Sequence, residues 1–108
     1  MDYIYNITFF VGKERLETLL SFLRGEFLET ALSGAGVELL HLTRVVNNQA
    51  MGMMEGEEQA VSIGMQFSAA DKTALDGWCA GALHQAFESL SARFGEEVLH
   101  FDTLLEVL

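Results

Sequence analysis

Two ionisable residues near the end of the chain are spaced so that they could act together on the surface of a sheet. His100 and Asp102 lie two apart in residues 97–105, a segment that alternates apolar and polar side chains as a β-strand does. Both side chains are therefore expected on one face, where the carboxylate could orient the imidazole for proton transfer or, with His41, hold a divalent metal. Ordinary hydrogen bonding at a subunit interface explains the same residues more simply. We predict no metal site and no cofactor, and keep His41, His100 and Asp102 as candidate catalytic residues.

Neutral polar residues in three other strand-like segments are predicted on the same face as this pair. They are Asn6, Thr8, Thr43, Ser62 and Gln66. Their amide and hydroxyl groups can donate and accept hydrogen bonds, which suits either a small-molecule pocket or polar contacts between subunits. Under the first interpretation they are candidate ligand-binding residues.

Other residues whose side chains could bind a metal or react have simpler explanations. His84 and Glu88 are four apart in a helical pattern, the spacing of a surface pair. Cys79 is the only cysteine and also lies in a helical pattern, so we interpret it as a small buried residue. Methionines 51, 53 and 54 could bind copper or form an adaptable contact surface over a partner subunit, and we favour contact. The chain contains no phosphate-binding glycine loop, nucleophile elbow or His-Glu-x-x-His motif.

The elements that position these residues follow from the spacing of apolar residues. Alternation with a period of two predicts strands, whereas apolar residues three and four apart predict helices. The predicted strands span residues 3–11, 37–47, 59–68 and 97–105. One predicted helix spans about 13–32, and a second begins at Ser68 or Asp71, either of which can cap it, and ends near Phe94. Residues 48–58 contain two glycines and show no period, which predicts a long hairpin connection.

The order strand, helix, strand, strand, helix, strand predicts an α+β fold of the ferredoxin-like βαββαβ type. Right-handed crossovers give a four-stranded antiparallel sheet with the first and third strands in the centre and both helices on one face. The face under the helices is predicted to contain Tyr5, Ile7, Phe9, Leu40, Leu42, Val61, Ile63, Met65, Leu99, Phe101 and Leu105. The opposite face is predicted to contain Ile4, Asn6, Thr8, Phe10, Leu39, His41, Thr43, Val45, Ser62, Gln66, Val98, His100 and Asp102.

This second face mixes apolar and polar residues in a way that suits neither water nor a sealed core. Large exposed apolar patches usually mark interfaces. Two copies packed sheet against sheet would cover the face and leave a partly polar cavity between them. We therefore expect a homodimer.

Length and composition set the remaining expectations. At 108 residues the chain is predicted to be one domain, residues 1–108. The net charge of −10 argues against nucleic acid and anionic membranes as partners. One cysteine, no basic leader and no long apolar run favour a cytoplasmic protein with no membrane insertion.

Three stretches resemble a family of small bacterial proteins known as domain of unknown function 4286. They are Ile4-Tyr5-Asn6-Ile7-Thr8-Phe9, Gln66-Phe67, and the end of the chain from Arg93 to Glu106. The resemblance extends over nearly the whole chain and implies a dimeric α/β-barrel arrangement of ferredoxin-like subunits. It implies no established activity.

Two functions from different classes are consistent with these patterns. The leading interpretation is a homodimer that binds a small molecule or a protein partner at the interface between the sheets. The alternative is a cofactor-independent enzyme similar to the monooxygenases and isomerases built as dimeric α/β barrels, with His41 or His100 as base and Asn6 or Gln66 polarising the substrate.

Overall fold

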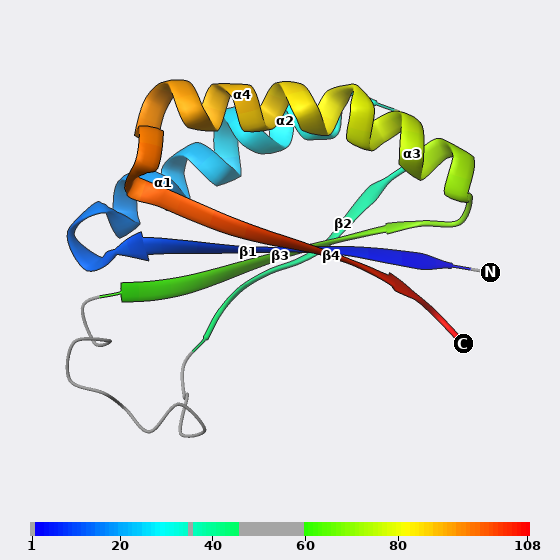
Figure 1. The fold of residues 1–108 in the computed structure, drawn as a ribbon, viewed down its shortest axis with the longest axis horizontal. Helices are drawn as coiled ribbons and strands as arrows, with labels where there is room; N and C mark the ends of the chain where they lie inside the picture. Colours follow the sequence, from blue (N-terminus) through cyan, green and yellow to red (C-terminus); the bar gives the residue numbers. More distant parts are fainter. Residues whose placement is uncertain (1, 35, 46–59) are drawn as a thin grey trace.

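The described part of the chain folds as one antiparallel sheet with the helices on one face (Figure 1). The computed structural model describes residues 2–34, 36–45 and 60–108. The strands are β1 (Tyr3–Gly12), β2 (Glu38–Arg44), β3 (Ala60–Ala69) and β4 (Val98–Glu106). Their order in the sheet is β2-β3-β1-β4, which confirms the ferredoxin-like topology with the first and third strands central. The predicted connection 48–58 and its methionines lie outside the described residues.

A continuous helical segment follows β1 and matches the predicted helix 13–32. It comprises η1 (Lys13–Arg15), α1 (Leu16–Phe22), the π-helical turn η2 (Leu23–Phe27) and α2 (Leu28–Ala31). Its apolar residues recur three and four apart, so Leu16, Leu19 and Leu23 all point into the core.

The second predicted helix is divided in two by Gly81. It consists of α3 (Lys72–Ala80) and α4 (Ala82–Phe94), and a short turn, η5 (Gly95–Glu97), connects it to β4. Asp71 caps α3 by accepting the backbone N–H of Thr73 at 3.2 Å. Gly95 ends α4 with a φ of 57°, a conformation that favours glycine.

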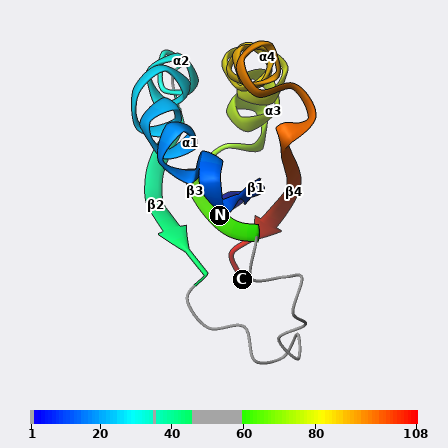
Figure 2. The ribbon, with the colours of Figure 1, turned by 90° about the vertical axis from the view of Figure 1, so that its left-hand side faces the viewer.

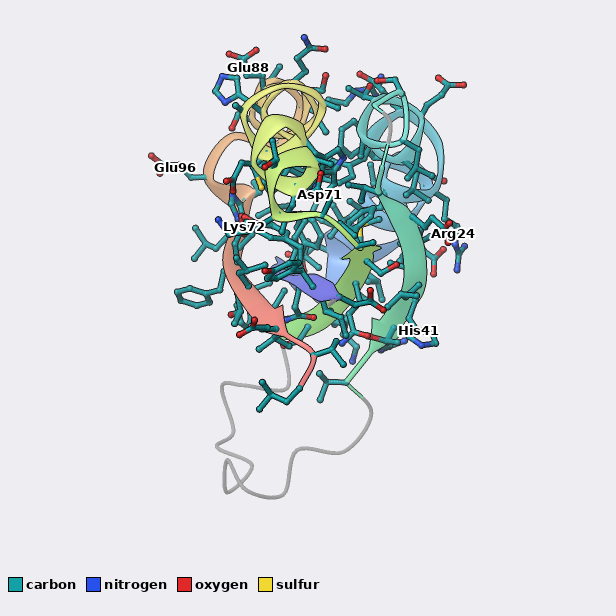
Figure 3. All side chains as sticks on the ribbon, turned by 90° about the vertical axis from the view of Figure 1, so that its right-hand side faces the viewer. Arg24, His41, Asp71, Lys72, Glu88 and Glu96 are labelled. Carbon is teal, nitrogen blue, oxygen red and sulfur yellow. The ribbon has the colours of Figure 1, made fainter. Side chains whose placement is uncertain are left out.

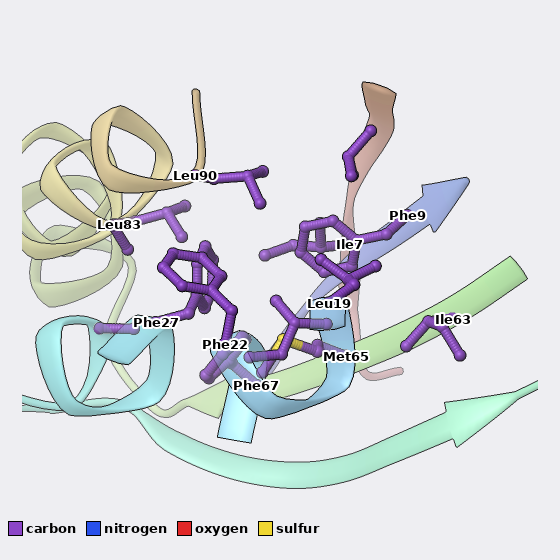
Figure 4. Close-up of a cluster of buried hydrophobic side chains, with 14 of the residues drawn as sticks. Ile7, Phe9, Leu19, Phe22, Phe27, Ile63, Met65, Phe67, Leu83 and Leu90 are labelled. Carbon is purple, nitrogen blue, oxygen red and sulfur yellow. The ribbon is translucent and has the colours of Figure 1, made fainter. Parts of the chain in front are cut away.

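The helices lie together on one side of the sheet (Figure 2), and the buried side chains of the core lie between these two layers (Figure 4). The central strands contribute every second residue to it: Ile7, Phe9 and Val11 from β1, and Val61, Ile63, Met65 and Phe67 from β3. The rings of Phe9 and Phe27 meet edge to face with centroids 5.7 Å apart. Trp78 donates its indole N–H to the carbonyl oxygen of Ala31 at 2.7 Å and so ties α3 to α2. The inward faces predicted for the two central strands are confirmed.

The predicted faces of β4 are wrong. Directly opposed residues of antiparallel strands point to the same face, and the register pairs Val98 with Val11, His100 with Phe9, Asp102 with Ile7 and Leu104 with Tyr5. Val98, His100 and Asp102 therefore face the helices, whereas Leu99, Phe101 and Leu105 lie on the open face. The more apolar side of the strand thus points away from the helices, opposite to the prediction from hydrophobicity. As an edge strand, β4 receives little cover from the helix layer, and Val98 is its only buried residue.

A β-bulge changes the predicted faces of β2. The register shifts between Leu39 and His41, so Leu39 lies opposite Phe67 and Leu42 opposite Met65, both on the helix side. Leu40, which we predicted under the helices, is 42% exposed. The extra residue breaks simple alternation in the strand. His41 and Thr43 keep their predicted place on the open face.

The two ends of the described chain lie side by side. The backbone N–H of Val107 donates to the carbonyl oxygen of Asp2 at 2.8 Å, which extends the pairing of β4 with β1. None of the helices in the described ranges combines the length and hydropathy needed to cross a bilayer.

Candidate functional site

The open face of the sheet brings together the predicted ligand-binding residues. In its central row His41 lies opposite Gln66, Gln66 opposite Asn6, and Asn6 opposite Thr103. The next row contains Thr43, Gly64, Thr8 and Phe101. Ser62 follows on β3, opposite Phe10. Figure 3 shows the His41 side chain at the β2 edge, on the side away from the helices. The five predicted ligand-binding residues and His41 thus share one surface.

Two long hydrogen bonds connect polar groups in this centre. The side-chain amide of Asn6 donates to the Thr8 hydroxyl at 3.3 Å, and the Thr43 hydroxyl donates to the carbonyl oxygen of Gly64 at 3.4 Å. A Cβ at Gly64 would lie 2.9 Å from the Thr43 hydroxyl oxygen, so a side chain there forces a shift. Because Gly64 has no side chain, its backbone is not covered by one between Thr43 and Thr8. Sequence analysis did not single out this glycine.

Apolar side chains surround the polar centre on several sides. The register places Leu105 beside Ile4 at one end, and Leu99 beside Phe10 at the other. Phe101 and Leu99 are 68% and 63% exposed. The rings of Phe101 and Phe10 meet edge to face with centroids 5.6 Å apart. Leaving this much apolar surface in water is unfavourable, so the face is suited to contact with another surface.

The central rows of the open face contain no carboxylate, lysine or arginine. His41 is their one ionisable residue. Asp2 and Glu38 belong to the same side by register, but they lie at one end of the sheet, beside Val107 and Ser68 respectively. The chain as a whole has a net charge of −10, so its charge is concentrated away from the middle of this face.

A separate polar network lies on the other side of the sheet, at the β1–β4 edge. The Tyr5 hydroxyl donates to Oδ2 of Asp102 at 2.6 Å, and Nδ1 of His100 lies 2.8 Å from Oδ1 of Asp102. The His100 ring stacks on Phe87 of α4, with centroids 4.1 Å apart and planes 5° from parallel. The two-residue spacing correctly predicted that His100 and Asp102 share a face, but the thickness of the sheet separates them from His41.

Tyr5 is the member of this network that sequence analysis missed. Its side chain was expected in the core, and its ring does meet that of Trp78 edge to face, with centroids 5.6 Å apart. Burial and, next, the hydrogen bond to Asp102 raise the pKa of the Tyr5 hydroxyl. Tyr5 is therefore a neutral hydrogen-bond donor at physiological pH. Only the strand register, which alternation does not reveal, places Tyr5 within reach of Asp102.

The remaining residues considered from the sequence do not form a reactive site. Burial and then the nearby Asp76 carboxylate raise the pKa of the Cys79 thiol, which keeps the thiol protonated and a poor nucleophile. His84 and Glu88 form the expected exposed pair at 3.3 Å. In the described ranges, no three His, Cys, Asp or Glu side chains lie close enough together to hold a metal ion.

The family model described as "Domain of unknown function (DUF4286)" matches residues 2–108. No curated protein matches the chain.

Solved structures of the same fold cover nearly the whole chain. A dimeric ferredoxin-like protein from an uncultured marine organism is 14% identical with a TM-score of 0.62, over 98% of this chain and 94% of that chain. A mutant of SnoaB, a cofactor-independent oxygenase from Streptomyces nogalater, is 11% identical with a TM-score of 0.62, over 99% and 94%. The de novo designed protein Foldit4 is 12% identical with a TM-score of 0.63, over all of both chains. At these identities the likeness is one of fold.

Proposed function

The chain belongs to the family described as "Domain of unknown function (DUF4286)", and we propose that it forms a homodimer through its open sheet face and binds a small molecule between the two sheets. The observation that carries the proposal is the pattern on that face. A polar, nearly uncharged centre is bordered by exposed apolar side chains such as Phe101 and Leu99.

The distribution of charge favours a second copy as the occupant of this face. Two chains that each carry −10 repel one another. At the centre of the open face, two copies can approach without bringing carboxylates together. A strongly basic partner would instead be attracted to the acidic surfaces elsewhere on the molecule.

The apolar border supplies the driving force for association. Full burial of a Phe or Leu side chain is worth roughly 1.5–3 kcal/mol. Leu99, Phe101 and Leu105 are each more than 40% exposed and lie on one strand, and in a symmetric dimer each is buried twice.

The polar centre gives the ligand its place. Asn6, Gln66 and Thr8 would be deprived of water by sheet-to-sheet packing, and buried polar groups need hydrogen-bond partners. A bound small molecule, with water, supplies them. The dimeric ferredoxin-like protein of the same fold supports this assembly by analogy.

Sedimentation equilibrium with a matched pair of variants tests the dimer. Phe101→Glu places a carboxylate on the open face, whereas Leu32→Glu makes a similar change at a 41% exposed position at the end of α2. We expect the wild type and Leu32→Glu to sediment as dimers at micromolar concentration, and Phe101→Glu to sediment as a monomer. Circular dichroism should show that Phe101→Glu is folded. A monomeric wild type, or three dimers, would contradict the proposal.

The alternative function is a cofactor-independent enzyme of the monooxygenase or isomerase type. It is favoured by the shared fold with SnoaB, described as a cofactor-independent oxygenase. On the open face the base would be His41, with Asn6 or Gln66 polarising the substrate, because His100 lies on the other side of the sheet. Oxygen uptake with phenolic compounds, present in the wild type and lost in His41→Ala, would support it. Uptake that persists in His41→Ala would contradict it.

A further inference from the structure

We infer that the ligand held between the two sheets is an uncharged, planar molecule that carries both hydrogen-bond donors and acceptors. The inference rests on the proposed dimer, because one open face alone encloses nothing. It adds the chemical class of the ligand, which follows from the groups that the face presents.

The open face has few groups that could balance the charge of an ionic ligand. An ion taken out of water needs an opposite charge beside it. The central rows of the open face contain no carboxylate, lysine or arginine, and their one ionisable residue, His41, lies at the β2 edge and away from Asn6 and Thr8. The net charge of −10 on each chain further disfavours an anion. A neutral molecule avoids both penalties.

The side-chain amides of Asn6 and Gln66 have hydrogen-bonding groups without a partner among the described residues. Each side-chain amide has two N–H donors and one carbonyl acceptor. Asn6 donates to Thr8, which leaves its carbonyl oxygen and its other donor available. Among the described residues the Gln66 side chain makes no hydrogen bond, although it lies directly opposite Asn6. Neighbouring amides of this kind complement a ligand that both donates and accepts.

The shape of the open face around Thr8 suits a planar ligand. Phe101 is 68% exposed and lies directly opposite Thr8, so an aromatic ring borders the polar centre. Gly64, in the same row, contributes no side chain, which leaves a low surface next to Thr8. A planar ligand can lie against the glycine backbone and contact the aromatic ring while its polar groups reach the two amides.

Three small aromatic probes of similar size and different charge test the ligand class. Benzamide, benzoate and benzylammonium are each titrated into uniformly ¹⁵N-labelled protein. We expect benzamide to shift the side-chain amide signals of Asn6 and Gln66, and to bind at least tenfold more tightly than either charged probe.

A charge-changing variant makes the test sharper. Gln66→Glu places a carboxylate in the central row, and we expect it to reverse the preference so that benzylammonium binds at least tenfold more tightly than benzamide. Gln85→Glu, the same change at an exposed position on α4, should keep the wild-type preference.

Light scattering on the same samples separates the two proposals. A monomeric wild type overturns the dimer and the inference with it. A dimer that prefers benzoate, binds the three probes equally, or shows no shift at Asn6 and Gln66 overturns the inference alone. A dimer with the expected preference and its reversal by Gln66→Glu supports both.

Discussion

Asp102 uses both carboxylate oxygens within the protein, one for Tyr5 and one for His100. We predict that Tyr5→Phe lowers the free energy of unfolding by about 1–2 kcal/mol at pH 7, because a charged acceptor loses a donor. Urea denaturation followed by circular dichroism measures this. Tyr3→Phe is the matched control, since Tyr3 precedes Tyr5 on the same face of β1 and donates no side-chain hydrogen bond within the described residues. Equal loss in both variants would contradict the assigned role.

The raised pKa of Tyr5 has its own consequence for stability at high pH. In the unfolded chain the phenol ionises near its ordinary pKa of 10.0, whereas the folded protein keeps it protonated. Below pH 10 the stabilisation is complete, and it decreases as the pH rises above 10 because the unfolded state then loses a proton that the folded state retains. We expect the wild type to lose stability more steeply than Tyr5→Phe between about pH 10 and 11.5. Parallel slopes in pH-dependent urea denaturation would refute this.

The sequence predicts which residues of one strand share a face, but it does not predict which residues of different strands lie close together. The shared face of His100 and Asp102 follows from their spacing alone. Tyr5 joins them only because β1 and β4 pair in one particular register, and nothing in the local pattern specifies that register. The proximity of Asn6 to Gln66 depends on register in the same way.

The place of β4 at the edge of the sheet explains why its two faces were predicted wrongly. Alternation identifies the two faces of a strand, and hydrophobicity then suggests which faces the core, an inference that works for β1 and β3 because helices cover them. β4 lies at the edge, where its more apolar side, with Leu99 and Phe101, points away from the helices. The bulge near Leu39 similarly escapes a rule that assumes strict alternation.

Gly64 provides a test of how closely β2 and β3 approach. We predict that Gly64→Ala lowers the free energy of unfolding by about 1–3 kcal/mol, because its Cβ would press on the Thr43 hydroxyl. Removing that hydroxyl by Thr43→Ala should restore most of the loss in the double variant. Thermal denaturation of the four proteins gives the coupling energy. Additive effects would show that the close contact is not the cause.

For the molecule as a whole, the order of elements and both helical segments could be predicted from spacing, and the observed strand order agrees. The resemblance to the family is confirmed by the match of its model to residues 2–108. The expectation of a homodimer came from a face that was too apolar for water. Four residues assigned to that face lie on the helix side instead: Leu39, Val98, His100 and Asp102. The exposed Leu99 and Phe101 lie on the open face in their place, so the face keeps its apolar character.

The charge on the proposed dimer predicts how salt affects it. Two chains of −10 combine to 2 × (−10) = −20 without an ion pair in the central rows of the interface. Salt screens this repulsion, with a Debye length of about 10 Å at 0.1 M. We therefore expect the dissociation constant from sedimentation equilibrium to fall as NaCl is raised from about 0.05 to about 0.5 M. A dissociation constant that rises with salt would indicate ion pairs across the interface and contradict the model.

The pairing of Val107 with Asp2 sets how the fold responds to mechanical load. The chain ends lie beside each other at one end of two adjacent antiparallel strands. A force that pulls them apart therefore breaks the β1–β4 hydrogen bonds one after another, starting at that end. Ends at opposite tips of paired strands would instead load all the bonds at once in shear. The domain should therefore yield at low force, beginning with β4.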